Sequence, residues 1–162
     1  MKLILSIFTG LFLLFQTSDL EALRSSYSKA NLSNEAAKNF IEAAAGKKSS
    51  SDPVIAGYKA AAEILQAKIT TEKNKRKTFV KSGATDLESI IKTNPNNIEL
   101  RLIRLSVQEN IPKIVGYSKN LKEDKTFILS NYGKQNPALK SYIRKFAMQS
   151  KTMTASEKNA LK

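Results

Sequence analysis

The sequence predicts an all-α domain of stacked helical hairpins, with about seven or eight helices after a signal peptide. Apolar residues recur at intervals of three and four along most of the chain, and no stretch keeps the alternation of a half-buried strand. Capping residues, prolines and glycines divide the chain into segments of helical length. Hydrophobic residues make up 41% of the 162 residues, which is enough for one core. We therefore expect a single domain over residues 18–162.

The first sixteen residues, MKLILSIFTGLFLLFQ, have the pattern of a secretory signal peptide. Lys2 supplies the positive start, and residues 3–15 form an uncharged run shorter than the roughly 20 residues that span a bilayer. Thr17 and Ser18 flank the expected cleavage point, although no A-x-A pattern marks it. A buried N-terminal helix and an uncleaved anchor are the alternatives. We predict a signal peptide over residues 1–17, export to the periplasm or cell envelope or secretion, and no transmembrane span in the mature chain.

Each of the first three helices is predicted to begin at a capping group: Ser18 with Glu21, Ser33 or Asn34, and Asp52 with Pro53. Their apolar stripes are, in chain order, Leu20, Leu23 and Tyr27; Ala36, Phe40 and Ala43 or Ala44; and Ile55, Tyr58, Ala62, Leu65 and Ile69. Gly46 is a good stop for the second helix. Each stripe occupies one helical face, so each helix should pack on that side.

A fourth helix is predicted from about Lys75 to Lys92, ending before Asn94-Pro95. Gly83 could instead end one helix, with Thr85 starting another. Helical phase continues through the glycine at Val80, Gly83, Leu87 and Ile90. We therefore predict one continuous helix in which Gly83 permits close packing against a neighbour, at a propensity cost of about 1 kcal/mol.

The fifth helix, residues 96–110, is predicted to be packed on two sides. One apolar stripe contains Ile98, Leu102 and Leu105, and a nearly opposite stripe contains Leu100, Ile103 and Val107. The polar edges between the stripes hold Arg101, Arg104 and Gln108 on one side and Glu99 and Ser106 on the other.

Two interpretations of the arginines on this helix remain open. A buried charge must be paired, so Arg101 and Arg104 could form ion pairs with a neighbouring helix. The candidate partners are Glu88, Glu123 and Asp124. The alternative is a binding groove for a carboxylate or phosphate on a peptide or glycan. Its predicted lining is Arg101, Arg104, Gln108 and Tyr117.

Three further helices are predicted after Pro112. The sixth runs from Asn120 to Tyr132 and should stop at Gly133. The seventh begins near Pro137, and a short helix follows the capping box of Thr154 and Glu157. Their inward residues are Leu121, Phe127, Ile128 and Tyr132 in the sixth helix and Leu139, Tyr142, Ile143 and Phe146 in the seventh.

Part of this pattern resembles the tetratricopeptide repeat, which alternates large and small residues on paired helices. The matching residues are Leu20, Leu23, Tyr27, Ala36, Phe40 and Ala43, and then Gly83, Leu87, Ile90 and Pro95. The chain departs from the repeat at Lys48, where proline is usual, and at Arg101 and Arg104, where large apolar residues are usual. The resemblance covers two of three or four hairpins and implies a tetratricopeptide-like stack.

The stretch NPNNIELRLIRLSVQENIPKIVGYSKNLKEDKTFIL also resembles a group of small exported proteins of Bacteroidota. These share a proline-asparagine turn, a helix with two arginines and a glutamine, and then a tyrosine before an acidic-lysine helix start. The resemblance covers roughly residues 53–132. It implies a helical fold and an envelope location, and it carries no activity.

The residue types argue against catalysis. The chain has no cysteine and no histidine, which excludes thiolate nucleophiles and removes the usual general base and the commonest metal ligand. Most of the 14 acidic residues fall at predicted helix starts, where the helix dipole stabilises them. No Gly-x-Ser-x-Gly elbow, Gly-rich phosphate loop or metal cluster occurs in the sequence. We predict no enzymatic activity, no catalytic or metal-ligating residues and no cofactor.

The net charge of +13, or +12 once Lys2 leaves with the signal peptide, favours anionic partners. Only five of the 27 basic residues are arginine, which disfavours nucleic acid. The densest basic patch comprises Lys73, Lys75, Arg76, Lys77 and Lys81. It is either a solvated helix start or a site for an anionic partner. Cations at a helix N-terminus oppose the helix dipole, and this unfavourable position supports the second interpretation.

The predicted function is a non-catalytic protein- or peptide-binding scaffold of the bacterial cell envelope. The alternative is a basic protein that binds anionic polymers or a membrane surface, with lipopolysaccharide, anionic lipid or nucleic acid as partner. Binding to a polyanion should weaken steeply with salt, whereas groove binding to a protein should weaken little.

Overall fold

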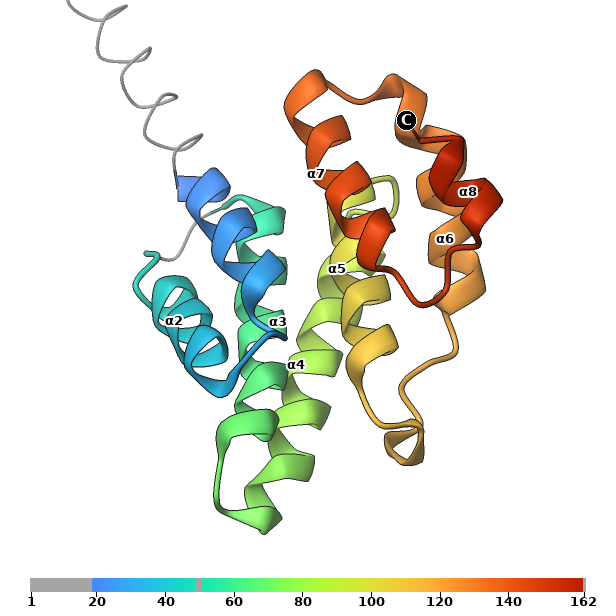
Figure 1. Cartoon of the computed structure of the whole chain (residues 1–162). Coiled ribbons are helices and arrows are strands. Elements are labelled where there is room, and N and C mark those ends of the chain that lie inside the picture. Colours follow the sequence, from blue (N-terminus) through green and yellow to red (C-terminus); the bar gives the residue numbers. More distant parts are fainter. Residues whose placement is uncertain (1–18, 49–50, 162) are drawn as a thin grey trace, which may run out of the picture.

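The computed structural model describes residues 19–48 and 51–161, and every regular element in those residues is helical (Figure 1). Residues 19–29 form the first helical segment. The others are α2 (Asn34–Ala45), α3 (Pro53–Ile69), α4 (Lys73–Thr93), α5 (Ile98–Asn110), α6 (Leu121–Asn131), α7 (Pro137–Gln149) and α8 (Ala155–Asn159). The all-α prediction is confirmed. The predicted signal peptide, residues 1–17, and the Ser18 cap lie outside the described residues.

Helix starts follow the predicted capping chemistry. The side chain of Ser33 accepts a hydrogen bond from the backbone N–H of Ala36. The side chain of Asp52, which precedes the N1 proline Pro53, accepts one from the backbone N–H of Val54. Thr154 and Glu157 form a complete capping box at the start of α8. Sequence-local signals therefore set most of the helix starts.

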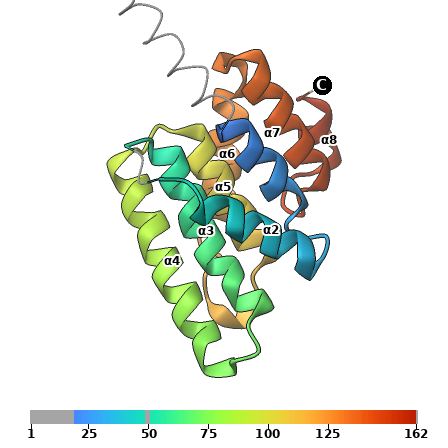
Figure 2. The ribbon, with the colours of Figure 1, turned by 90° about the vertical axis from the view of Figure 1, so that its left-hand side faces the viewer.

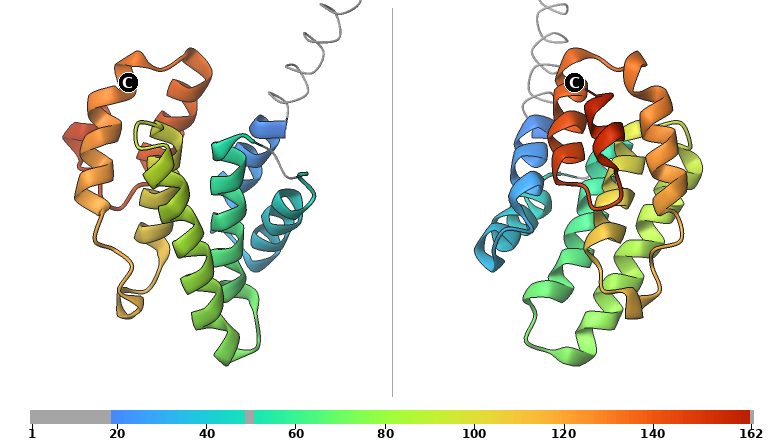
Figure 3. Two further views of the ribbon diagram at one scale, coloured as in Figure 1. Left: turned by 180° about the vertical axis from the view of Figure 1, so that it is seen from behind. Right: turned by 45° about the vertical axis from the view of Figure 1, so that its right-hand side comes forward.

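The central helix of the fold is α5. Ten of its 13 residues are buried, because other helices cover it on two sides (Figures 1 and 3). The stripe of Leu100, Ile103 and Val107 joins the core formed with residues 19–30, α2, α3 and α4. The opposite stripe of Ile98, Leu102 and Leu105 joins the second core, formed with α6, α7 and the C-terminal segment. The predicted two-sided burial is confirmed.

Helices α3 and α4 form a long hairpin. The end at which the two helices are connected extends beyond the other helices (Figure 2). Gly83 is buried where α4 crosses α3, and a Cβ built there would lie 2.5 Å from the carbonyl oxygen of Ala60. The helix continues through Gly83 to Thr93, so the predicted close packing at this glycine is confirmed. Only a residue without a side chain permits that approach.

A few boundaries and faces differ from the prediction. Helix α4 begins at Lys73 rather than Lys75, and α6 ends at Asn131, before a 3-10 turn that contains Gly133. In α2 the fully buried alanines are Ala37 and Ala44. After Pro112, a 3-10 turn, Lys113–Val115, ends at Gly116, whose φ of 73° is left-handed. The tetratricopeptide-like arrangement of the hairpins remains a prediction.

Candidate functional site

The two α5 arginines lie against carboxylates of other helices. Arg104 donates from Nε and Nη2 to the two carboxylate oxygens of Asp124, both at 2.7 Å, and from Nη1 to Glu88 at 2.7 Å. The side chain of Arg104 is 3% exposed and that of Asp124 is 0% exposed. Burial lowers the pKa of Arg104, but its bonds to Asp124 and Glu88 outweigh this effect and raise it.

The pKa of Asp124 is also raised, but for a different reason. Burial raises it by more than the bonds from Arg104 and Arg101 lower it. The two parallel bonds between Arg104 and Asp124 are the geometry of an ionised guanidinium–carboxylate pair. We therefore describe Arg104 and Asp124 as a buried ion pair.

The other members of the predicted Arg101–Arg104–Gln108–Tyr117 groove are also bonded within the protein. Arg101 donates to Asp124 at 3.1 Å and to the more exposed Glu123. Gln108 accepts from the backbone N–H of Asn120 at 3.1 Å and donates to the Asn120 side chain at 3.2 Å.

Tyr117 donates to Glu88 at 2.8 Å, and burial together with this bond raises the pKa of its hydroxyl. Arg101, Arg104 and Gln108 do lie along one edge of α5, and Tyr117 donates to the same carboxylate, Glu88, as Arg104. Their polar atoms, however, hold α5 against α4, α6 and the segment before α6, as the ion-pair interpretation predicts.

The opposite polar edge of α5 holds a second ion pair, between buried Glu99 and partly buried Arg24, that the sequence does not predict. Glu99 accepts from Arg24 through two bonds of 2.7 and 2.6 Å and from the hydroxyl of Tyr58 at 2.7 Å. The Tyr142 hydroxyl lies 3.1 Å from that of Tyr58, so this cluster joins helices of both cores. The sequence places Glu99 on this polar edge, but nothing in the local pattern relates it to Arg24, 75 residues away.

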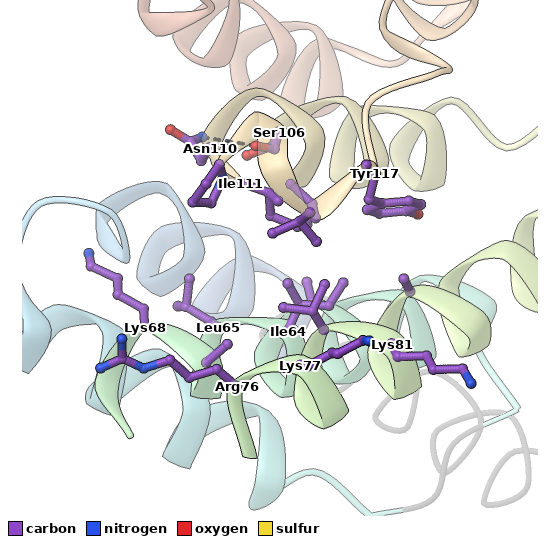
Figure 4. Close-up of a pocket in the computed structure, with 18 of the residues that line it drawn as sticks. Ile64, Leu65, Lys68, Arg76, Lys77, Lys81, Ser106, Asn110, Ile111 and Tyr117 are labelled. Atoms are coloured by element: carbon purple, nitrogen blue, oxygen red, sulfur yellow. Dashed lines mark hydrogen bonds between the residues drawn. The ribbon is translucent and has the colours of Figure 1, made fainter. Parts of the chain in front are cut away.

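A groove of about 1360 Å³ lies between the α3–α4 hairpin on one side and α5 with residues 111–119 on the other (Figure 4). Figure 4 shows Ile64 and Leu65 pointing toward Ile111 across the groove, with Tyr117 on the same side as Ile111. The apolar lining includes Ala61, Ile64, Leu65, Val80, Ala84, Val107 and Ile111. Of the four residues predicted to line a binding groove, Arg101, Arg104, Gln108 and Tyr117, only Tyr117 is part of this lining.

Cations surround this apolar surface. The basic residues that line it are Lys68, Lys73, Arg76, Lys77, Lys81 and Lys119. The one carboxylate among the described lining residues is Glu88, which already bonds Arg104 and Tyr117. Four of the five residues of the predicted basic patch therefore line the groove. The fifth, Lys75, pairs with Glu72.

The groove lysines of α4 have no partner among the residues that the structure describes. Within the described residues, the ammonium groups of Lys73, Lys77 and Lys81 make no hydrogen bond and no ion pair, and Arg76 bonds only the carbonyl of Thr70. These cations occupy the first half of α4, whose first turn has no acidic residue and whose N-cap, Glu72, makes no side-chain cap bond. Lys73, in the first turn, opposes the helix dipole, and lysines four residues apart repel each other. Charges placed unfavourably for their own helix are typical of a functional surface.

Exposed apolar side chains gather at the groove mouth. Ile114 is 96% exposed, and Val115 beside it is also exposed; both belong to the lining. Large exposed apolar residues at the edge of a concave surface indicate a contact site. The sequence reasoning missed this surface because residues 111–119 meet α3 and α4 only in the folded chain.

Comparison with protein-family models, with curated proteins and with solved structures finds no match for this chain. In residues 19–48 and 51–161, His, Cys, Asp and Glu side chains nowhere gather in threes as a metal site would require. The described helices also include none with the length and apolar character of a membrane span.

Proposed function

We propose that this protein is a non-catalytic scaffold of the bacterial cell envelope and that its groove binds a peptide segment of a partner protein. The observation that supports this most is the apolar groove whose bordering lysines on α4 have no partner in the described chain. A volume of about 1360 Å³ exceeds the roughly 300–1,000 Å³ of typical small-molecule pockets. The envelope location rests on the signal-peptide pattern of residues 1–17.

Site-specific crosslinking tests this proposal, since the chain has no cysteine of its own. Ile114→Cys, labelled with a photoreactive maleimide, places the probe at the groove mouth. Met148→Cys, on α7 and 57% exposed, is the matched control because it does not line the groove. We expect a defined partner to be crosslinked in envelope extracts from Ile114→Cys and not from Met148→Cys. Identical products from both positions, or none from Ile114→Cys, would contradict the proposal.

A membrane surface is the second candidate, favoured by the near-complete exposure of Ile114 beside the basic groove rim. An apolar tip with surrounding lysines can enter the headgroup region of an anionic bilayer. Vesicles with and without phosphatidylglycerol distinguish the two functions. Under the peptide-binding proposal, a fluorophore on Ile114→Cys should show no shift with either vesicle, and a shift only with anionic vesicles would favour the membrane.

A further inference from the structure

The groove walls restrict the conformation of a bound peptide. Helices α3, α4 and α5 form most of the walls, and their backbone groups are bonded within each helix. The described chain also contains no strand, so an extended peptide would find no sheet edge with which to pair. A peptide that buries itself against these walls must satisfy its own backbone hydrogen bonds, and an α-helix does so.

The lysines of the groove have a regular spacing. Lys73, Lys77 and Lys81 follow one another at i, i+4 and i+8 on α4, and all three line the groove. With a rise of 1.5 Å per residue, they form a row about 12 Å long on one side of α4. A second helix with carboxylates at the same spacing, lying along α4, would bring one carboxylate to each lysine. Such pairs would also offset the repulsion within the row.

The apolar part of the groove suits a helical stripe. Ile64, Val80 and Ala84 lie on the hairpin side and Val107 and Ile111 on the facing side, so apolar side chains contact a ligand from both directions. Ile114 and Val115 extend this surface to the mouth. An amphipathic helix presents leucine-like anchors at i, i+3, i+4 and i+7 to a groove of this kind.

We infer that the groove binds an acidic amphipathic α-helix, with its apolar stripe on the groove floor and its carboxylates against Lys73, Lys77 and Lys81. This inference rests on the proposed function and specifies the class of its partner. The row of Lys73, Lys77 and Lys81 aligns the axis of the ligand helix with α4. The apolar floor of the groove supplies the contact area.

A designed peptide tests this inference by fluorescence anisotropy. The probe is a labelled 16-residue helix with a leucine stripe and glutamates at i, i+4 and i+8 along one edge of the stripe. One control peptide replaces the three glutamates by glutamine, and another carries a central proline that breaks the helix. We expect the glutamate peptide to bind, the glutamine peptide to bind at least about tenfold more weakly, and the proline peptide to show no saturable binding.

Protein variants locate the binding surface. Lys73→Glu, Lys77→Glu and Lys81→Glu together should abolish binding of the glutamate peptide. Lys38→Glu, Lys122→Glu and Lys145→Glu change the net charge equally at exposed positions outside the groove, and should leave the Kd within about twofold of the wild type. Circular dichroism confirms that both triple variants are folded.

The outcomes separate this inference from the proposed function. Equal affinity for the glutamate and glutamine peptides, or binding of the proline peptide, would overturn the acidic-helix inference. No peptide binding together with a partner crosslinked from Ile114→Cys would overturn the inference and leave the proposed function standing. Absence of both, with anionic vesicles bound instead, would overturn both.

Discussion

Two rows of basic residues on neighbouring helices have opposite surroundings. On α5, Arg101 and Arg104 face Glu88, Glu123 and Asp124, with the closest contacts of Arg104 at 2.7 Å. On α4, Lys73, Lys77 and Lys81 face the groove and contact no carboxylate of the described chain. In both rows the basic residues recur at helical spacing, three residues apart on α5 and four residues apart on α4. The difference lies in burial and in residue type.

The comparison teaches how to separate structural charge from binding charge. A guanidinium fork satisfies a buried carboxylate through two bonds, and removal of either partner leaves an expensive unpaired charge. A lysine ammonium on a solvated rim costs little in the free protein and remains available to a ligand. The arginines of α5 thus stabilise the fold, and the lysines of α4 carry the proposed binding function.

The largest effect should come from Arg104→Ala. This change leaves the carboxylate of Asp124, which is 0% exposed in the wild type, with only the 3.1 Å contact from Arg101 among the described residues. Breaking a buried ion pair costs about 3–5 kcal/mol, a large share of the stability of a domain of this size. Urea unfolding measures the loss. A cost below about 1 kcal/mol would show that the pair is not a major element of the fold.

A smaller loss is expected for Gly83→Ala. The new Cβ would lie 2.5 Å from the carbonyl oxygen of Ala60 and 2.7 Å from Ile64 Cγ1, so α4 must shift away from α3. Overpacking of this kind costs about 1–3 kcal/mol, more than the roughly 1 kcal/mol of helix propensity that alanine restores. Because α4 carries the lysine row, its displacement should also weaken peptide binding.

The control for this prediction is Gly133→Ala, where the new Cβ would meet no atom within 4 Å. Urea unfolding should show no loss of stability for this variant. If Gly83→Ala is as stable as the wild type, close packing at this glycine does not position α4.

Arg101→Ala should cost less than Arg104→Ala. Arg104 still holds Asp124 through two bonds, and the other partner of Arg101, Glu123, is exposed. We expect a loss of about 1–2 kcal/mol from the charged hydrogen bonds that disappear. Urea unfolding of the two variants in parallel compares their losses of unfolding free energy. The comparison tests the assignment of Arg104 as the central residue of this ion-pair cluster. A larger loss for Arg101→Ala would reverse it.

The smallest expected effect has the opposite sign. Lys77→Ala removes two repulsions along α4, from Lys73 and from Lys81, each worth about 0.2–0.5 kcal/mol. Thermal unfolding should therefore show a slightly higher melting temperature for Lys77→Ala, with a smaller gain as salt is added. Destabilisation by more than about 0.5 kcal/mol would mean that Lys77 supports the fold.

The sequence predicted those features whose cause is local. The two stripes of α5 correspond residue for residue to the two cores, because helical periodicity places Leu100 and Leu102 on different faces. Continuity of α4 through Gly83 followed from the same periodicity. Glu88, Glu123 and Asp124 were expected as partners of the arginines, since a doubly buried helix cannot leave a guanidinium unpaired.

Features that depend on distant segments could not be predicted. The pairing of Arg24 with Glu99 joins the first described helix to α5 and leaves no local signal. The lysine row and Tyr117 were predicted as parts of two separate sites, and both line one groove. Their meeting depends on how residues 111–119 fold back beside the α3–α4 hairpin, which no periodicity encodes.

The most direct test of the account measures stability and binding on one protein, the Lys73→Glu, Lys77→Glu, Lys81→Glu triple variant. If the α4 lysines serve binding and not folding, its melting temperature should equal or exceed that of the wild type, because the three ammonium groups make no ion pair within the described residues and a glutamate at position 73 suits the helix N-terminus. Its affinity for the acidic helical peptide should fall at least about tenfold. A lower melting temperature with unchanged peptide affinity would contradict the division between structural arginines on α5 and binding lysines on α4.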